Sequence, residues 1–121
     1  MNAAPKIKID ERSLHLFAVQ LLRLSAAPTV VFFHTPNEGA RSPRTGAFQK
    51  KMGMRAGVAD LVLILPPSGM FAAIELKSTD GRLTPEQRRF RDDVEAAGGT
   101  FAVCNSPDQV SEILHKWGAV R

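Results

Sequence analysis

The sequence predicts an α/β fold in which a mixed sheet is flanked by helices. Segments with the apolar spacing of amphipathic helices alternate with short β-branched and aromatic runs, and capping residues mark the starts of the later helices. The predicted order is a helix, three strands, a helix, a strand and a C-terminal helix. With 121 residues, 44% of them hydrophobic and 23% charged, the chain is expected to fold as a single domain over residues 1–121.

The first element is a helix predicted over about residues 10–25, with Asp10 as its N-cap. Its apolar stripe consists of Leu14, Ala18, Leu21 and Leu22. Glu11 has the spacing of this stripe although it is charged, so we expect an acid on the buried side of the helix. The alternative is that Glu11 only favours the positive end of the helix dipole.

A short strand and a long loop are predicted next. The β-branched and aromatic run Thr29–Phe33 is typical of a buried strand. From there to about residue 57 the chain is rich in Gly, Pro and Arg, which predicts a loop long enough to be functional. The cations that fall between Glu38 and Asp60, where no acid occurs, are Arg41, Arg44, Lys50, Lys51 and Arg55. With a net charge of +4, they favour an anionic partner such as nucleic acid, although a solvated basic loop would give the same pattern.

Residues 58–65 and 70–77 are predicted as two strands of a hairpin, joined by the loop Pro66-Pro67-Ser68-Gly69. If this loop closes directly, Leu65 pairs with Met70 and fixes the register of the whole hairpin. One face of the hairpin is then apolar, and its members are Leu61, Leu63, Leu65, Ala72, Ile74 and Leu76.

The opposite face of the same hairpin carries charge. Asp60 lies opposite Glu75 in this register, and Lys77 shares their face because side chains two apart on a strand point the same way. Mg²⁺ takes carboxylate oxygens, so the two acids are candidate metal ligands and the lysine a candidate cation beside the attacking water. The alternative is a structural salt bridge among the three side chains.

The remaining elements are a helix, a strand and a helix. Thr84 has the properties of an N-cap, and Gln87 stands at the third position of a capping box. This helix is predicted to stop at residues 98–99, before a strand over residues 100–104 and a last helix that begins near Ser106. The lone Cys104 has no partner for a disulfide and is expected to be a small core residue.

Several motifs surround Asp60 and the run Glu75-Leu76-Lys77. They are Asn37-Glu38-Gly39, Gly53-Met54-Arg55-Ala56-Gly57-Val58-Ala59-Asp60, Ile74-Glu75-Leu76-Lys77, Gly81-Arg82-Leu83-Thr84-Pro85-Glu86-Gln87 and Gly98. The acids and the lysine resemble the PD-(D/E)XK nuclease superfamily, with Ala59 in the place of its proline. The whole set, from about Glu11 to the last helix, resembles one branch of that superfamily, the virus-type replication-repair nuclease (VRR-NUC) domain.

This resemblance implies a restriction-endonuclease-like core in the order α-β-β-β-α-β, which matches the order predicted from the residues. It also implies hydrolysis of phosphodiester bonds that depends on Mg²⁺ or Mn²⁺. Asp60, Glu75 and the backbone carbonyl of Leu76 would surround the metal, and Lys77 would lie beside the water.

Two further residues match catalytic positions of the family. Glu11 lies where the family has an acid on its first helix, which implies a catalytic and metal-binding role. Gln87 matches the glutamine that follows the catalytic strand, although it would also serve as a capping residue alone. The residues expected to bind DNA, mainly through phosphates, are Asn37, Arg41, Arg44, Lys50, Lys51, Arg55 and Arg82. His15 and His34 are possible acid–base groups, but a lone histidine is more often structural, and neither is placed in the predicted site.

Members of the family without accessory domains are similar to homodimeric resolvases of branched DNA. The resemblance therefore implies an endonuclease that cuts four-way (Holliday) junctions as a homodimer, since two-fold symmetry matches paired incisions. The alternatives are a nuclease for flaps or forked ends and a non-catalytic DNA-binding module. An RNA-binding scaffold ranks last, because the chain has no Tyr and a single Trp for stacking on bases.

Other partners and locations are not expected. No apolar run approaches the about 18 residues that a membrane helix needs, and the first residues lack the features of a secretory signal. We therefore expect a protein of the cytoplasm, in a bacterium or a phage-infected cell, with no membrane association and no nucleotide cofactor.

Overall fold

The computed structural model describes residues 8–36 and 42–121. Its elements are α1 (Glu11–Ser25), β1 (Val31–His34), α2 (Pro43–Lys51), β2 (Leu61–Leu65), β3 (Met70–Leu76), α3 (Pro85–Ala96), β4 (Thr100–Cys104) and α4 (Pro107–Lys116). This order confirms the predicted one, with α2 as an addition.

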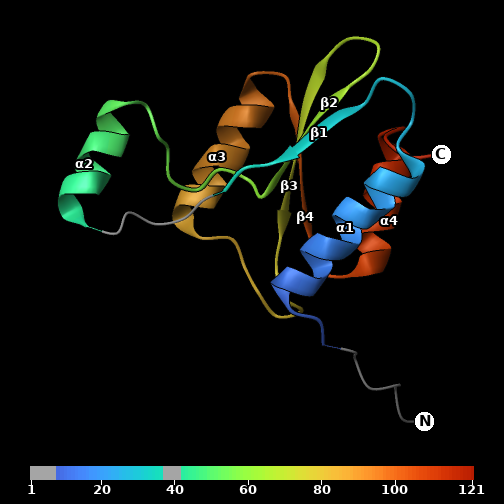
Figure 1. Cartoon of the computed structure of the whole chain (residues 1–121), viewed down its shortest axis with the longest axis horizontal. Coiled ribbons are helices and arrows are strands. Elements are labelled where there is room, and N and C mark those ends of the chain that lie inside the picture. Colours follow the sequence, from blue (N-terminus) through green and yellow to red (C-terminus); the bar gives the residue numbers. More distant parts are fainter. Residues whose placement is uncertain (1–7, 37–41) are drawn as a thin grey trace.

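The four strands form one mixed sheet in the order β1-β2-β3-β4. The first two pairings are antiparallel, and β3 pairs with β4 in parallel. Leu65 pairs with Met70 and Leu61 with Ile74, so the predicted hairpin register is confirmed. Figure 1 shows α1 and α4 on one side of the sheet and α3 on the other, which is the expected mixed sheet flanked by helices.

The main hydrophobic core lies between the sheet and the helices α1 and α4. Its fully buried residues include Leu14, Ala18, Leu22, Leu61, Leu63, Ala72, Ile74, Val110 and Leu114. Burying one such leucine contributes about 1.5–3 kcal/mol to stability, so this face fixes the position of the sheet. Cys104 belongs to the same core, and burial raises the pKa of its thiol to about 11.

Three sequence expectations need correction. The strand β1 is an exposed edge strand rather than a buried one, with Val31 50% and Phe33 46% exposed, because none of the described helices covers that end of the sheet on one face. The strand β2 begins at Leu61 and not at residue 58, which leaves Asp60 just outside the ladder. Glu11 is exposed rather than on the buried side of α1, because it lies in the first turn, before the stripe reaches the core.

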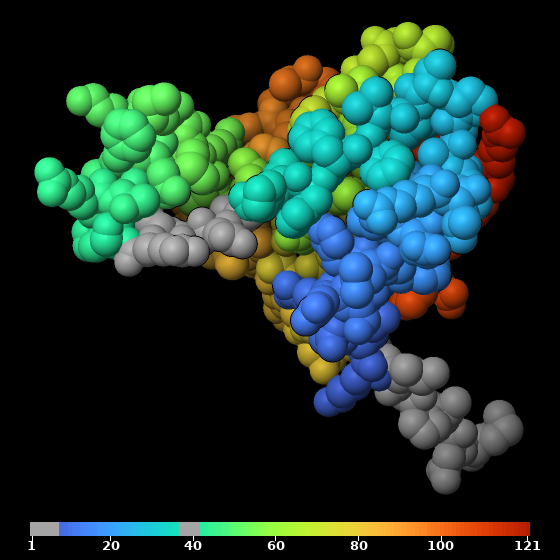
Figure 2. Space-filling model, in the orientation of Figure 1, coloured from blue at the N-terminus to red at the C-terminus, as the bar shows by residue number. Residues whose placement is uncertain are grey.

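The helix α2 lies within the segment that the sequence predicts to be a long loop. It begins with the N-cap Ser42, whose hydroxyl accepts a hydrogen bond from the amide of Thr45 at 3.2 Å, and Pro43 follows in the first turn. None of its residues is buried, so it lacks the apolar stripe by which helices are recognised in a sequence. It projects beside α3, away from α1 and α4 (Figures 1 and 2).

Among the helices within the described residues, none is both long and apolar enough to cross a membrane.

Candidate active site

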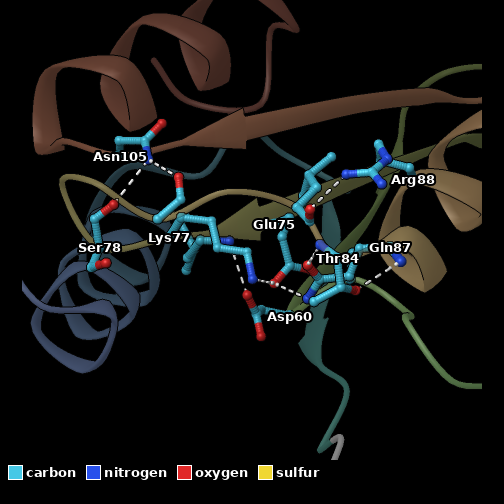
Figure 3. A network of polar contacts seen from close by, with 12 residues as sticks. Asp60, Glu75, Lys77, Ser78, Thr84, Gln87, Arg88 and Asn105 are labelled. Carbon is cyan, nitrogen blue, oxygen red and sulfur yellow. Dashed lines mark hydrogen bonds and ion pairs between the residues drawn. The ribbon is translucent and has the colours of Figure 1, made fainter.

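The predicted charged cluster is assembled where β2 begins and β3 ends. Glu75 and Lys77 are 3% and 8% exposed, and the ammonium of Lys77 lies 3.9 Å from Oε1 of Glu75. The end of β3 also holds the Asp60 carboxylate, because Oδ2 of Asp60 accepts a hydrogen bond from the backbone amide of Leu76 at 2.9 Å. Figure 3 shows the three side chains pointing toward one another.

Gln87 joins this cluster from α3. Its backbone amide donates to the hydroxyl of Thr84, and its Oε1 accepts from the amide of Thr84, so the predicted capping box is present. Its side-chain Nε2 donates at the same time to Oε1 of Glu75, at 3.1 Å. The capping role and the contact with the cluster therefore coexist in one amide group.

The electrostatics of the cluster centre on Glu75. Burial, a hydrogen bond with Asp60 and the charge of Asp60 raise the pKa of Glu75 to about 9, against the opposing charge of Lys77. Its Oε2 is buried and has no hydrogen-bond partner among the described residues. Burying this acid with an unpartnered oxygen beside the half-buried Asp60 is unfavourable by itself, and a bound cation would relieve the cost.

The donor set fits a hard divalent metal ion. Asp60 and Glu75 could supply carboxylate oxygens, and Leu76, whose amide donates to Asp60, could supply its backbone carbonyl. Within residues 8–36 and 42–121 no group of three or more His, Cys, Asp or Glu side chains is arranged to hold a metal. The remaining ligands would be waters and phosphate oxygens, as is common for Mg²⁺.

A cleft of about 270 Å³ opens beside Asp60. Its lining residues are Glu11, Arg12, His15, Leu16, His34, Asp60 and Leu76. The structure thus brings Glu11 to the same cleft as Asp60.

The same cleft contains both histidines that the sequence interpretation set aside. Nδ1 of His34 lies 2.7 Å from the carbonyl oxygen of Asp60, and the rings of His15 and His34 meet edge to face with centroids 4.5 Å apart. Burial, followed by the charge of His34, lowers the pKa of His15. The sequence carries one signal for His15, which lies one helical turn after Glu11. That His34 ends the strand that pairs with β2 is seen only in the structure.

The predicted DNA-binding residues are divided between several places. Arg44, Lys50 and Lys51 are exposed on α2, and Arg82 is exposed in the loop before α3. Asn37 and Arg41 lie outside the described residues.

Arg55 differs from these cations because α3 already engages it. Its guanidinium lies 2.5 Å from the carboxylate of Asp93, and it is stacked over the ring of Phe90 at 5.4 Å from the centroid. These contacts tie the segment before Asp60 to α3.

Gly57 makes a second tie between this segment and α3. It has a φ of +82°, and a Cβ at this position would overlap the backbone carbonyl group of Glu86. Only glycine therefore lets the chain pass so close to the first turn of α3, which is the turn that presents Gln87 to Glu75.

The mixed sheet with an Asp, a Glu and a Lys gathered at the end of its central hairpin is the arrangement that the PD-(D/E)XK superfamily implies. The sequence model of the VRR-NUC domain matches residues 18–108. This chain therefore belongs to the VRR-NUC family, and its function is of the nuclease type.

The fold supports the same assignment. A solved structure described as a VRR_NUC domain protein superposes with a TM-score of 0.68 at 17% sequence identity, over 95% of this chain and 98% of that chain. No curated protein matches this chain.

Proposed function

We propose that this protein is a metal-dependent endonuclease that hydrolyses phosphodiester bonds in branched DNA, with the four-way junction as its substrate. The observation that carries this proposal is the cluster of the half-buried Asp60 with the buried Glu75 and Lys77, in which Oε2 of Glu75 has no hydrogen-bond partner among the described residues. Most buried side-chain oxygens in folded proteins have a partner, so this one favours a site that binds a cation.

The side chains divide the work as follows. Asp60, Glu75 and the carbonyl of Leu76 would hold Mg²⁺ or Mn²⁺, which when bound activates water and neutralises charge on the phosphate. Lys77 carries a positive charge beside the carboxylates and stabilises the negative charge that develops on the phosphate oxygens. Gln87 fixes the orientation of the Glu75 carboxylate through its donated hydrogen bond.

Glu11 completes the proposed site from the rim of the cleft that it shares with Asp60. Its exposed carboxylate can reach a metal ion through a bound water, a mode that Mg²⁺ often uses. Its charge is also the last and smallest of the causes that raise the pKa of Glu75.

The substrate proposal follows from the basic surface and from symmetry. Arg44, Lys50 and Lys51 are exposed on one projecting helix, α2. Phosphate contacts of this kind favour recognition of shape rather than sequence. A homodimer would place two such sites across a four-way junction, which matches paired incisions.

Incision of labelled DNA tests the proposal. A four-way junction, a flap and a matched linear duplex are incubated with the wild type, Asp60→Asn or Lys77→Ala, in Mg²⁺, Mn²⁺ or EDTA. We expect symmetric junction cuts that require metal and fall by at least about 100-fold in both variants. Asp92→Asn is the control, because it removes an exposed carboxylate of α3 that lies outside the cluster.

Each other result has a definite meaning. If the flap is cut in preference to the junction, the flap replaces the junction as the proposed substrate, and the proposed nuclease activity stands. Metal-independent binding of the junction with no cutting in any metal would overturn the catalytic proposal in favour of a DNA-binding module.

A further inference from the structure

The helix α2 contributes nothing to the core. Within the described residues it packs against no other helix or strand, and none of its side chains is buried. An isolated helix of this length is only marginally stable in water. Because α2 is not packed in the core, packing does not dictate which residues it exposes. The residues exposed on α2 therefore need an explanation outside the fold.

One face of α2 combines an aromatic ring with positive charge. Phe48 is 62% exposed, and Met52 at the C-cap is 71% exposed. Residues three and four apart on a helix share a face, so Arg44 and Lys51 flank the ring of Phe48 on either side. The helix contains no Asp or Glu.

The segment that carries α2 begins and ends at the candidate active site. The amide of Thr35, just after β1, donates to the carbonyl oxygen of Asp60 at 3.1 Å, and its hydroxyl donates to the carbonyl of Ala59. Both ends of this excursion are therefore held beside the catalytic cluster.

Charge complementarity decides what kind of ligand fits this face. A protein surface that covered Phe48 would have to desolvate the two flanking cations, which costs several kcal/mol for each unpaired charge. Nucleic acid offers phosphates to the cations and a base to the ring. Stacking of one base on an aromatic side chain contributes about 1–3 kcal/mol, and apolar side chains insert where DNA steps are unstacked.

We propose that Phe48 is a specificity-determining residue that stacks on an unstacked base at the branch point of DNA, while Arg44 and Lys51 bind the phosphates on either side. This inference rests on the proposed function. It names the Phe48 ring as the group by which the protein distinguishes branched from linear DNA, because the bases of a linear duplex remain stacked on one another.

Binding without cleavage provides the test. Affinities for a four-way junction and for a matched linear duplex are measured in EDTA, in the Asp60→Asn background, for Phe48→Ala and Phe48→Trp. Gln49→Ala is the control on another face of the same helix. Thermal unfolding of each variant checks the fold, which we expect to be unchanged because Phe48 packs on no other element.

We expect Phe48→Ala to weaken junction binding about 10-fold, which corresponds to about 1.4 kcal/mol of lost stacking, and to change duplex binding less than about 2-fold. Phe48→Trp should restore the preference. Arg44→Gln and Lys51→Gln should weaken binding to both DNAs and reduce its salt dependence.

Three results would overturn the inference. They are equal loss on both DNAs, no loss on either, and dissociation of a dimer by Phe48→Ala in sedimentation, which would make a second copy the occupant of this face. The binding experiment does not require catalysis. Phe48→Ala can therefore be shown to lose the preference for the junction even if the incision experiment detects no cutting, so the two proposals fail separately.

Discussion

At the scale of single residues, Glu75 has a protonation state that differs between the folded and the unfolded chain. Its pKa is about 9 in the folded protein without metal and 4.5 ordinarily. Between these values the folded state holds a proton that the unfolded state has lost. The free energy of unfolding must therefore fall as pH rises through this window, by up to about 1.4 kcal/mol for each pH unit.

The expected result is a stability difference between the wild type and Glu75→Gln that depends on pH. In EDTA, denaturant unfolding between pH 5 and pH 9 should show the wild type losing stability relative to the variant, whose side chain stays neutral. Added Mg²⁺ should stabilise the wild type increasingly at higher pH and should leave the variant nearly unchanged. Parallel curves for the two proteins would contradict this assignment of the proton.

The cluster around Glu75 was also the part of the site that the sequence predicted best. The apolar alternation of the hairpin and its short loop fixed the register, and the register placed Asp60, Glu75 and Lys77 together. The histidines escaped prediction because they meet only in three dimensions. His15 belongs to α1 and His34 to β1, and no local periodicity relates a helix face to a strand end.

At the scale of elements, the contact between Gly57 and the first turn of α3 determines where Gln87 stands. We expect Gly57→Ala to lower the free energy of unfolding by at least about 2 kcal/mol, since it adds left-handed strain to steric overlap with the backbone. Gly98→Ala is the matched control: Gly98 also has a positive φ, of +94°, but a Cβ there meets nothing within 4 Å.

Denaturant unfolding of both variants measures the difference. Gly98→Ala should show only the cost of the backbone conformation, about 1–2 kcal/mol. Equal losses in the two variants would show that the approach to α3 carries no energetic weight. A larger loss in Gly57→Ala, together with weaker metal binding, would show that α3 and the cluster are coupled through this glycine.

The elements that the sequence did not predict share one physical cause. The spacing of apolar residues in a sequence indicates which face of a helix packs against a core. The helix α2 packs against none of the described elements, so it has no such spacing. The strand β1 carries apolar residues on both faces, as a buried strand would, but only Phe32 packs on the core. Whether a neighbouring element covers the second face of β1 depends on the arrangement of the whole fold. The sequence alone therefore predicts a buried strand where the structure has an exposed one.

At the scale of the whole molecule, that uncovered face supports the proposed homodimer. Val31, Phe33 and Ile64 expose apolar side chains on the side of β1 and β2 opposite α1 and α4. A stable interface buries about 800 Å² on each partner and has an apolar centre. We expect the wild type to sediment as a dimer and Phe33→Glu to sediment as a monomer that still unfolds cooperatively, at a lower temperature because the stabilisation from association is lost.

Leu24→Glu provides the control for this experiment, because Leu24 is 75% exposed at the end of α1, on the other side of the sheet. It should remain dimeric. A wild type that sediments as a monomer at tens of micromolar would argue against the homodimer, and dissociation by both substitutions would argue against this face.

The hydrogen bonds of Thr35 to Ala59 and Asp60 have a consequence for how the protein can change over time. They close the excursion between β1 and β2 at its base, so its two ends stay together whatever lies between them. Doubling the length of such a loop costs only about 0.6 kcal/mol in closure entropy. Under the proposed function, insertions and deletions there would change which DNA structures are bound and would leave the proposed catalytic cluster in place.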